Sequence, residues 1–407
     1  MDNLELFTRA LTLPNPWKVQ SIDFQSNETT GQEELHIRIG HSPGAKFATH
    51  GEQDCPVYDH REKTWQHLHF FQYRCFIHCN TPRVVLSDGK PHLVEVPWAR
   101  SGSGFTLLFE AFGMQLVEKE MPVSQAAEQM GINDKRFWRF FKYWVDDARA
   151  KADYSDVEAV GIDETSTRRG HHYFTLGVDL KQNRVVHVSE NKDADAVKSF
   201  AQFLESVGCK PEQIRQASID FSRAFIKGVH DCFPSAQITF DRFHLAKMIN
   251  EALDATRREY RSKYEQVKHS RWALLKNPIN LTANQKKKLE EVKELEEIGE
   301  AYRLKTLFAD FYTLNNVEEA EGFLVDYCLQ LRSSGLRPFQ ELAKTINRHW
   351  DGILNYVRTR ITNGILESIN SQVQLAKRRA RGYRNLENFK TMIYFIAGKL
   401  DFSTHLI

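Results

Sequence analysis

Alternating apolar and polar residues divide the first third of the chain into a strand-rich part and a helical part. Residues 67–86 and 93–100 alternate or run apolar over lengths typical of strands. The pattern breaks at SGSG, residues 101–104, and residues 105–120 then have the spacing of a helix. We therefore expect a β-rich N-terminal module over residues 1–100.

Two more helices are predicted directly after this one. Ser124 is placed to cap the first, Gly131 breaks it, and Asp134 is placed to cap the second. The second helix is basic, which favours a DNA-binding helix-turn-helix at residues 101–152 over an ordinary pair of packed helices. The side chains expected to contact DNA are Arg136 and Arg139.

Strand patterns return after residue 153. Apolar runs predict three strands with short turns, then a helix, a strand ending in SIDFS, a short helix and a strand ending in TFDRFH. The first three strands suit an antiparallel meander, and helical crossovers then add parallel strands. An α/β fold with a mixed five-stranded sheet, covered by helices on both faces, is the expected core over residues 153–245.

Beyond Leu245 the chain has only helical patterns. Residues 246–345 alternate acidic and basic side chains in places, as solvated helix faces do. We interpret them as an all-helical insertion, and residues 346–407 as a second part of the core with a basic tail.

Composition narrows the class of protein. The 407 residues suffice for two to four domains, 41% of them are hydrophobic, and the net charge is +2. No signal-peptide pattern and no apolar run of membrane-spanning length is present, so a soluble cytoplasmic protein is expected. Six cysteines in a chain of this size do not suggest a disulfide framework.

Two acids lie where predicted strands end. Asp163 ends the first strand of the meander, and Asp220 lies near the end of the fourth strand, which a crossover would place beside the first. Two carboxylates held close together repel each other unless a cation lies between them. Mg²⁺ is the natural candidate, because it takes one or two carboxylates and completes its shell with water and phosphate oxygens.

A third acid lies on a predicted helix near the C-terminus. Asn363, Glu367, Asn370 and Gln374 form a polar stripe, and Glu367 is its only acid. By itself, Glu367 would be interpreted as a solvated carboxylate.

The motifs GIDE, SIDFS, FDRFH and TNGILESIN, in this order, resemble those of the DDE transposases of bacterial insertion sequences, in the ISL-type group related to Mutator-like elements. The resemblance covers nearly the whole chain. It implies an RNase H-like core with a helical insertion before the glutamate. It also implies a catalytic, metal-binding triad of Asp163, Asp220 and Glu367, with two Mg²⁺ ions that Mn²⁺ could replace.

Further residues gain roles from the same resemblance. An Asp-x-x-His signature falls on Asp241 and His244, which could equally be a structural polar pair at a strand-to-helix turn. With Asn363 and Asn370 they are expected to support the site.

The expected substrate is double-stranded DNA, both the terminal inverted repeats of an element and its target. A homodimer or larger oligomer would assemble on this DNA, at the bacterial nucleoid. Two alternatives are a domesticated DNA-binding protein without chemistry and a structure-specific nuclease on the same fold. The three acids argue against the first, and the helix-turn-helix and large insertion argue against the second.

Basic residues near the site are expected to grip DNA phosphates. They are Arg168, Arg169, Lys377, Arg378, Arg379, Arg381 and Arg384. An exposed turn for the first two, and a solvated helix end for the others, are the alternative interpretations.

Family members usually carry an N-terminal zinc ribbon with paired Cys-x-x-Cys ligands, and this chain lacks that spacing. A mixed zinc site would use Cys55, Cys75, His78 and Cys79. The other interpretation is a zinc-less β module that keeps the shape of the ribbon.

Overall fold

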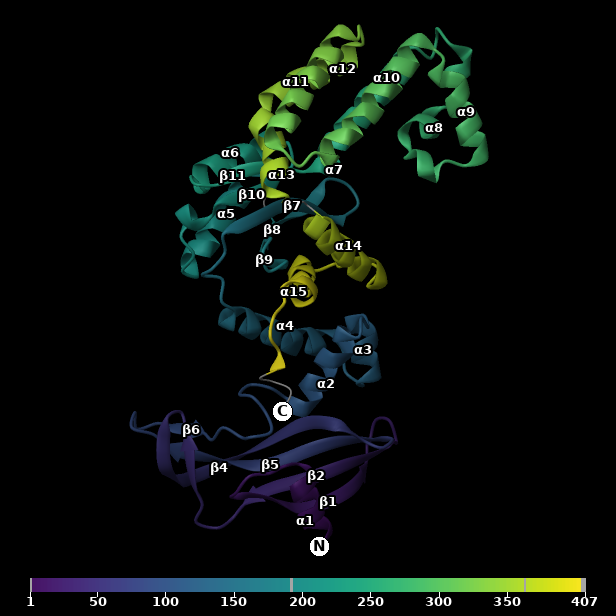
Figure 1. Cartoon of the computed structure of the whole chain (residues 1–407). Coiled ribbons are helices and arrows are strands. Elements are labelled where there is room, and N and C mark those ends of the chain that lie inside the picture. The colour runs from purple at the N-terminus through teal and green to yellow at the C-terminus, as the bar shows by residue number, and fades with distance from the viewer. Residues whose placement is uncertain (1, 191–192, 362–363, 404–407) are drawn as a thin grey trace. The chain divides into compact units, whose positions relative to one another are not determined.

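The computed structural model describes residues 2–190, 193–361 and 364–403. The chain forms two compact units (Figure 1). The first runs to Ala152 and includes the chain end after Lys399; the second is Asp153–Lys399. Among the described residues, no helix combines the length and apolar character that crossing a membrane requires.

The first unit begins with a short helix and a six-stranded sheet. The elements are α1 (Asn3–Ala10), β1 (Trp17–Ser26), β2 (Glu33–His41), β3 (Lys46–Thr49), β4 (Glu52–Phe70), β5 (Tyr73–Val85) and β6 (Pro91–Leu93). The strand order is β1-β2-β5-β4-β3, with β6 paired to β5. One face carries a hydrophobic core that includes Trp17, Ile37, Trp65, Ile77 and Trp98. This core holds the strands of the module together.

The expected zinc site has no support in this sheet. Cys75 and Cys79 point into the core, where burial raises the pKa of their thiols to about 12 and about 11. His78 points to the opposite face, because side chains alternate along a strand, and there it contacts His36 at 2.7 Å. Cys55 is also buried, on β4 opposite Phe47. Neutral buried thiols on one face and an imidazole on the other do not form a ligand set.

Three helices complete the first unit: α2 (Leu107–Glu118), α3 (Val123–Gln129) and α4 (Asp134–Lys151). Their existence was predicted, but both predicted caps were wrong. Pro122 precedes α3, so Ser124 lies inside the helix. Asn133, not Asp134, caps α4, and its side chain accepts a hydrogen bond from the N–H of Arg136 at 2.9 Å.

The second unit contains the five-stranded sheet that the sequence predicts. The strands are β7 (Ala159–Arg168), β8 (His172–Asp179), β9 (Arg184–Ser189), β10 (Gln216–Ile219) and β11 (Gln237–Phe240), in the order β11-β10-β7-β8-β9. β7, β8 and β9 pair antiparallel, whereas β10 and β11 are parallel to β7. The expectation that β7 ends at Asp163 was wrong, since β7 continues to Arg168.

Helices cover both faces of this sheet. They are α5 (Asp193–Ser206), α6 (Arg223–Cys232), α14 (Gly364–Arg379) and α15 (Leu386–Ala397), with a short 3-10 turn, η1 (Pro211–Gln213). Phe200 of α5 lies against Gly177, and Leu366 of α14 lies against Gly161 on the other face. A Cβ atom at Gly161 would be only 2.9 Å from Leu366 Cδ1, so glycine lets α14 approach the strand closely.

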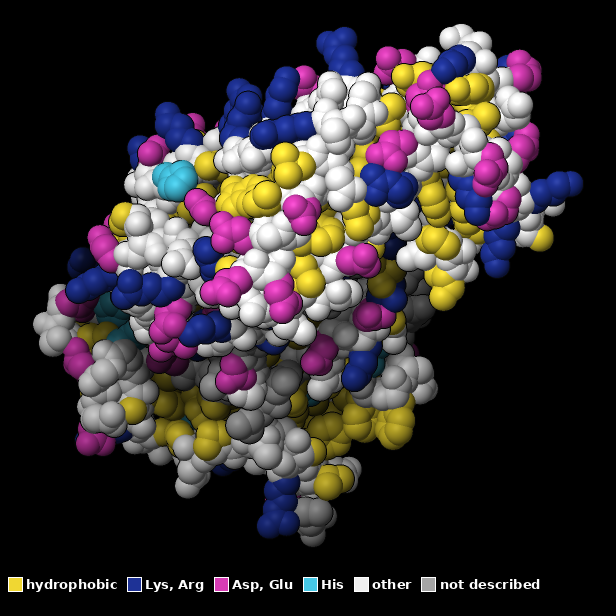
Figure 2. All heavy atoms as spheres, turned by 45° about the horizontal axis from the view of Figure 1, so that its top comes forward, with side chains coloured by type: hydrophobic (Ala, Val, Ile, Leu, Met, Phe, Trp, Pro, Cys, Tyr) yellow, Lys and Arg dark blue, Asp and Glu magenta, His cyan; other side chains and the backbone are white. Residues whose placement is uncertain are grey.

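Between β11 and α14 the described chain is entirely helical. The elements are α7 (Arg242–Glu259), η2 (Glu265–Val267), α8 (Arg271–Leu275), η3 (Pro278–Asn280), α9 (Ala283–Lys293), α10 (Glu296–Leu307), η4 (Phe308–Thr313), α11 (Val317–Ser333), α12 (Arg337–Arg348) and α13 (Trp350–Thr359). They extend away from the sheet as arms, and α13 returns to pack on β11 (Figure 1). In the face shown in Figure 2, acidic and basic side chains are intermixed over much of this region.

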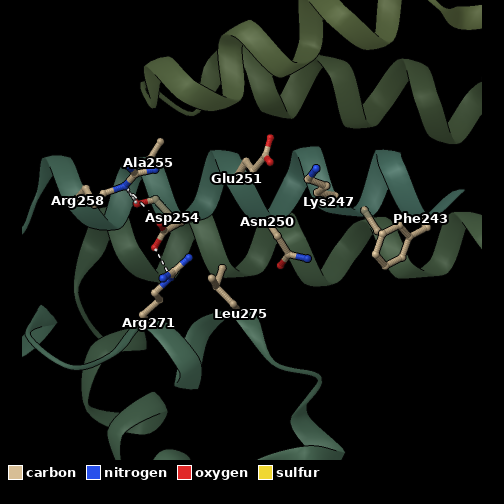
Figure 3. Close-up of a pocket in the computed structure, with 10 residues that line it drawn as sticks. Phe243, Lys247, Asn250, Glu251, Asp254, Ala255, Arg258, Arg271 and Leu275 are labelled. Carbon is tan, nitrogen blue, oxygen red and sulfur yellow. Dashed lines mark hydrogen bonds and ion pairs between the residues drawn. The ribbon is translucent and has the colours of Figure 1, made fainter. Parts of the chain in front are cut away.

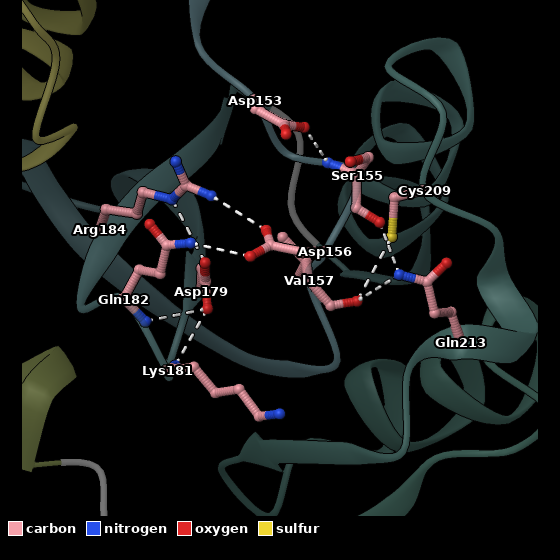
Figure 4. Close-up of polar contacts among 10 residues, drawn as sticks. All are labelled: Asp153, Ser155, Asp156, Val157, Asp179, Lys181, Gln182, Arg184, Cys209 and Gln213. Atoms are coloured by element: carbon pink, nitrogen blue, oxygen red, sulfur yellow. Dashed lines mark hydrogen bonds and ion pairs between the residues drawn. The ribbon is translucent and has the colours of Figure 1, made fainter.

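A polar network stabilises the turn between β8 and β9 (Figure 4). The buried carboxylate of Asp179 accepts hydrogen bonds from the backbone N–H of Lys181 at 3.0 Å and from Nε of Arg184 at 3.2 Å. The Arg184 guanidinium also lies 3.6 Å from Asp156 Oδ1 and over the ring of Tyr154. Each acid in this region has a cation beside it.

Candidate active site

The pairing of three parallel strands, β7, β10 and β11, brings three aspartates to one level of the sheet. Gln216, Ala217 and Ser218 of β10 pair with Ala159, Val160 and Gly161 of β7. The same register, carried two residues further, places Asp220 beside Asp163. On the other side of β10, Ile219 pairs with Phe240, so the next position places Asp241 beside Asp220. We call Asp163, Asp220 and Asp241 the acid row.

Both oxygen atoms of Asp163 accept hydrogen bonds. Its Oδ1 accepts a hydrogen bond from the N–H of Glu164 at 2.8 Å, and its Oδ2 accepts one from Nδ2 of Asn370 at 2.7 Å. Burial raises the pKa of Asp163 to about 6, and the charges of the other two acids act in the same direction. The ionised form of this carboxylate is therefore held at a cost in free energy.

The other two acids are tied to the helices that follow them. Asp220 Oδ1 accepts a hydrogen bond from the N–H of Ser222 at 2.8 Å, just before α6. The buried Asp241 caps α7 through the N–H of Phe243 and contacts Nδ1 of His244 at 2.8 Å. This hydrogen bond raises the pKa of His244, and all three acids add to the effect. Both helices begin beside the acid row, where their positive ends favour negative charge.

A polar stripe on α14 fixes that helix along β7. Asn370 bonds Asp163, Gln374 Nε2 donates to Thr165 Oγ1 at 2.9 Å, and Lys377 Nζ donates to the carbonyl of Ser166 at 2.7 Å. Asn370 and Gln374 belong to the predicted stripe. Lys377 extends it by one turn, and the i, i+4, i+7 spacing from Asn370 was the signal for this role.

Glu367 lies on the same helix, three residues before Asn370, so the two side chains are neighbours on its surface. It is exposed, and the structure does not bring it into contact with the acid row. Asn363, the other expected support residue on this stripe, lies outside the described residues.

A hard divalent cation such as Mg²⁺ is held in proteins by carboxylate oxygen atoms, which the acid row supplies. Among the described residues, no group of three or more His, Cys, Asp and Glu side chains is placed to hold a metal ion. Asp163 and Asp220 nevertheless supply hard oxygen atoms at one level of the sheet, and the imidazole of His244 beside them is already bonded to Asp241. Two carboxylates are the usual protein contribution to a Mg²⁺ site, so the pair fits this ion.

The expected DNA-binding residues differ in how freely they are presented. Arg139 is exposed, whereas Arg136 is half-buried with its guanidinium 4.3 Å from the ring centroid of Phe105. Lys377 is engaged with β7, as described above. The exposed arginines at the β7–β8 turn and at the end of α14 are Arg168, Arg169, Arg378, Arg379, Arg381 and Arg384.

Comparison with known proteins gives a consistent result. Residues 160–393 match a transposase family model of the ISL3 type, and residues 94–145 match the helix-turn-helix domain of transposase family ISL3. The transposase for insertion sequence element IS1557 of Mycobacterium tuberculosis is 25% identical over 95% of this chain and 93% of its own length. The transposase for insertion sequence element IS1001 of Bordetella parapertussis is 26% identical over 79% of this chain and 81% of its own length.

Proposed function

The chain belongs to the ISL3 family of insertion-sequence transposases, and on this premise we propose that the acid row is where it cuts and joins DNA. The observation that carries the proposal is the shared register of β7, β10 and β11, which sets Asp163, Asp220 and Asp241 at one level. We assign the triad to Asp163, Asp220 and Glu367, on a core of the RNase H-like type.

Asp163 and Asp220 would hold the divalent cations, and Glu367 would complete the ligand set from α14. When bound, such ions activate the attacking hydroxyl and neutralise charge on the phosphate. Asp241 is not assigned to the triad; its two oxygen atoms contact the N–H of Phe243 and Nδ1 of His244.

The protein's own groups position these carboxylates. Asn370 orients Asp163 through its side-chain amide, and the backbone N–H groups of Glu164 and Ser222 fix one oxygen of each aspartate. His244 balances part of the negative charge. Such preorganisation lowers the cost of rearranging charge during the reaction.

DNA recognition is assigned to both units. The helix-turn-helix would read the terminal inverted repeats, with Arg139 the better presented of the two predicted arginines. The exposed arginines around α14 and the β7–β8 turn would contact phosphates near the cut. Recombining two ends requires two sites, so we propose an assembly of at least two chains on DNA in the bacterial cytoplasm.

Cleavage of a supercoiled plasmid that carries the element's ends tests the assignment. In Mg²⁺, Asp220→Asn and Asp163→Asn are expected to lower cleavage at least about a thousandfold while end binding stays within about twofold of wild type. Glu164→Gln is the matched control, because Glu164 adjoins Asp163 but points to the other face of β7. It should cut normally. Near-normal cleavage by Asp220→Asn would contradict the assignment.

A further inference from the structure

A cleft in the helical region begins close to the acid row, since Phe243, which lines it, is two residues after Asp241. It lies between α7 and α8 and has a volume of about 680 Å³ (Figure 3). This size is in the range of sites that enclose one small organic group rather than a folded partner. Because α7 begins immediately after Asp241, the cleft and the acid row share one helix.

Phe243 lies at the mouth of the cleft. Its side chain is 58% exposed, and its ring centroid is 5.9 Å from that of His244, which is bonded to Asp241. An aromatic ring that contributes little to the core is thus held next to the acids. The flat face of such a ring is a stacking surface for a nucleobase.

Asn250 lies deeper on the same face of α7, seven residues or two turns after Phe243. Its side-chain Oδ1 is buried and has no hydrogen-bond partner among the described residues. A buried acceptor without a partner costs free energy unless a ligand supplies a donor. The amino group of a base is a donor of the kind required.

The charged residues that line the cleft are Lys247, Arg258 and Arg271 against Glu251 and Asp254, an excess of one positive charge. Asp254 is neutralised by Arg258 at 3.3 Å and Arg271 at 3.7 Å. Lys247 lies on α7 between Phe243 and Asn250 (Figure 3). Its positive charge is therefore placed beside any phosphate attached to a nucleotide bound in the cleft. The mixed surface charge of the region in Figure 2 argues for such a local contact rather than a broad phosphate-binding field.

We propose that this cleft binds an unpaired nucleotide of the DNA strand next to the cut. The base stacks on Phe243, its amino group donates to Asn250 Oδ1, and Lys247 faces a neighbouring phosphate. This inference rests on the proposed function of the acid row. It adds that the DNA is locally unpaired when the acids engage it, with the base taken out of the stack.

Binding of fluorescein-labelled single-stranded oligo(dC) to the full chain in EDTA, followed by anisotropy, tests the proposal. Phe243→Ala is expected to weaken binding about tenfold, since stacking on an aromatic side chain is worth about 1–3 kcal/mol per base. Phe243→Trp should retain it. Asn250→Leu should reduce the affinity for oligo(dC) to that for oligo(dT), which lacks the amino group.

Leu329→Ala provides the control, because this α11 side chain is 56% exposed and does not line the cleft. Duplex binding through the helix-turn-helix should be the same in all variants. Oligo(dC) affinity of Phe243→Ala within twofold of wild type, or an equal loss in Leu329→Ala, would overturn the proposal. No cleavage occurs in EDTA, so this result is independent of the plasmid assay, which alone judges the acid row as a cutting site.

Discussion

Negative charge is arranged in opposite ways near the start of β7 and in its middle. Near its start, the buried Asp179 and its neighbour Asp156 share the guanidinium of Arg184 (Figure 4). Further along the strand, the acid row sets three carboxylates together with one histidine and the amide of Asn370. The same sheet therefore carries one region with matched charges and one with an excess of negative charge.

The difference separates a stabilising arrangement from a functional one. The matched region needs nothing from outside the protein. The acid row sets three carboxylates against His244 and has a raised Asp163 pKa, so its charges are held together by the rest of the fold. After folding, the acid row still has an excess of negative charge. A cation, together with the phosphate that it binds, would therefore stabilise the acid row more than the matched region.

The largest effect on stability is expected at the matched region. Arg184→Met should lower the free energy of unfolding by about 3–5 kcal/mol, because it leaves the buried Asp179 without its cation. Urea unfolding followed by circular dichroism measures the change. The double variant Arg184→Met, Asp179→Asn removes both charges and should recover part of the loss. A single variant as stable as wild type would show that Arg184 does not compensate Asp179.

An opposite and smaller effect is expected at the acid row. Asp163→Asn should raise the free energy of unfolding by about 1–2 kcal/mol at pH 8 in EDTA, while abolishing cleavage. The folded-state pKa of Asp163 is raised to about 6, so its ionised form costs stability above that pH. The gain should shrink as the pH falls to about 4, where Asp163 is protonated in the folded state but still partly ionised in the unfolded state.

Urea midpoints at the two pH values measure this prediction. The groups that face Asp163 are Asp220, Asp241 and His244, and they are unchanged in the variant. An Asp163→Asn protein that is less stable than wild type at pH 8 would mean that the carboxylate is not held at a cost. The contrast between the matched region and the acid row would then be lost.

The smallest effect should come from a surface pair beside the matched region. Lys181 and Glu158 form an ion pair, but both side chains are at least half exposed. Solvent and salt screen such pairs, so Lys181→Ala should leave the urea midpoint unchanged within error. A loss as large as that of Arg184→Met would mean that the charge network extends to the surface.

The order and pairing of the central strands could be predicted from sequence, because short turns and helical crossovers leave few arrangements. Placing Asp220 beside Asp163 follows from that pairing. The polar stripe of α14 was also visible, since helical spacing alone gathers Asn370 and Gln374 on one face. What they bond could not be predicted, because it depends on how closely Gly161 lets α14 approach β7.

Other features depend on contacts that local patterns do not encode. Ser124 and Asp134 were plausible caps, but the helices begin one or more residues earlier than their positions suggest. The sequence made Cys75, Cys79 and His78 candidate ligands. Side chains alternate along β5, however, so the two thiols lie on one face of the sheet and the imidazole on the other. The cleft at Phe243 forms where α8 packs against α7, and no sequence motif predicts this contact.

The bond between Asn370 and Asp163 joins residues 207 positions apart in the chain. A ribosome therefore completes the DNA-reading helices and all five strands long before it makes the helix that secures Asp163. On the proposed function, a gene copy interrupted between these points would encode the helix-turn-helix assigned to end recognition without the helix that secures Asp163.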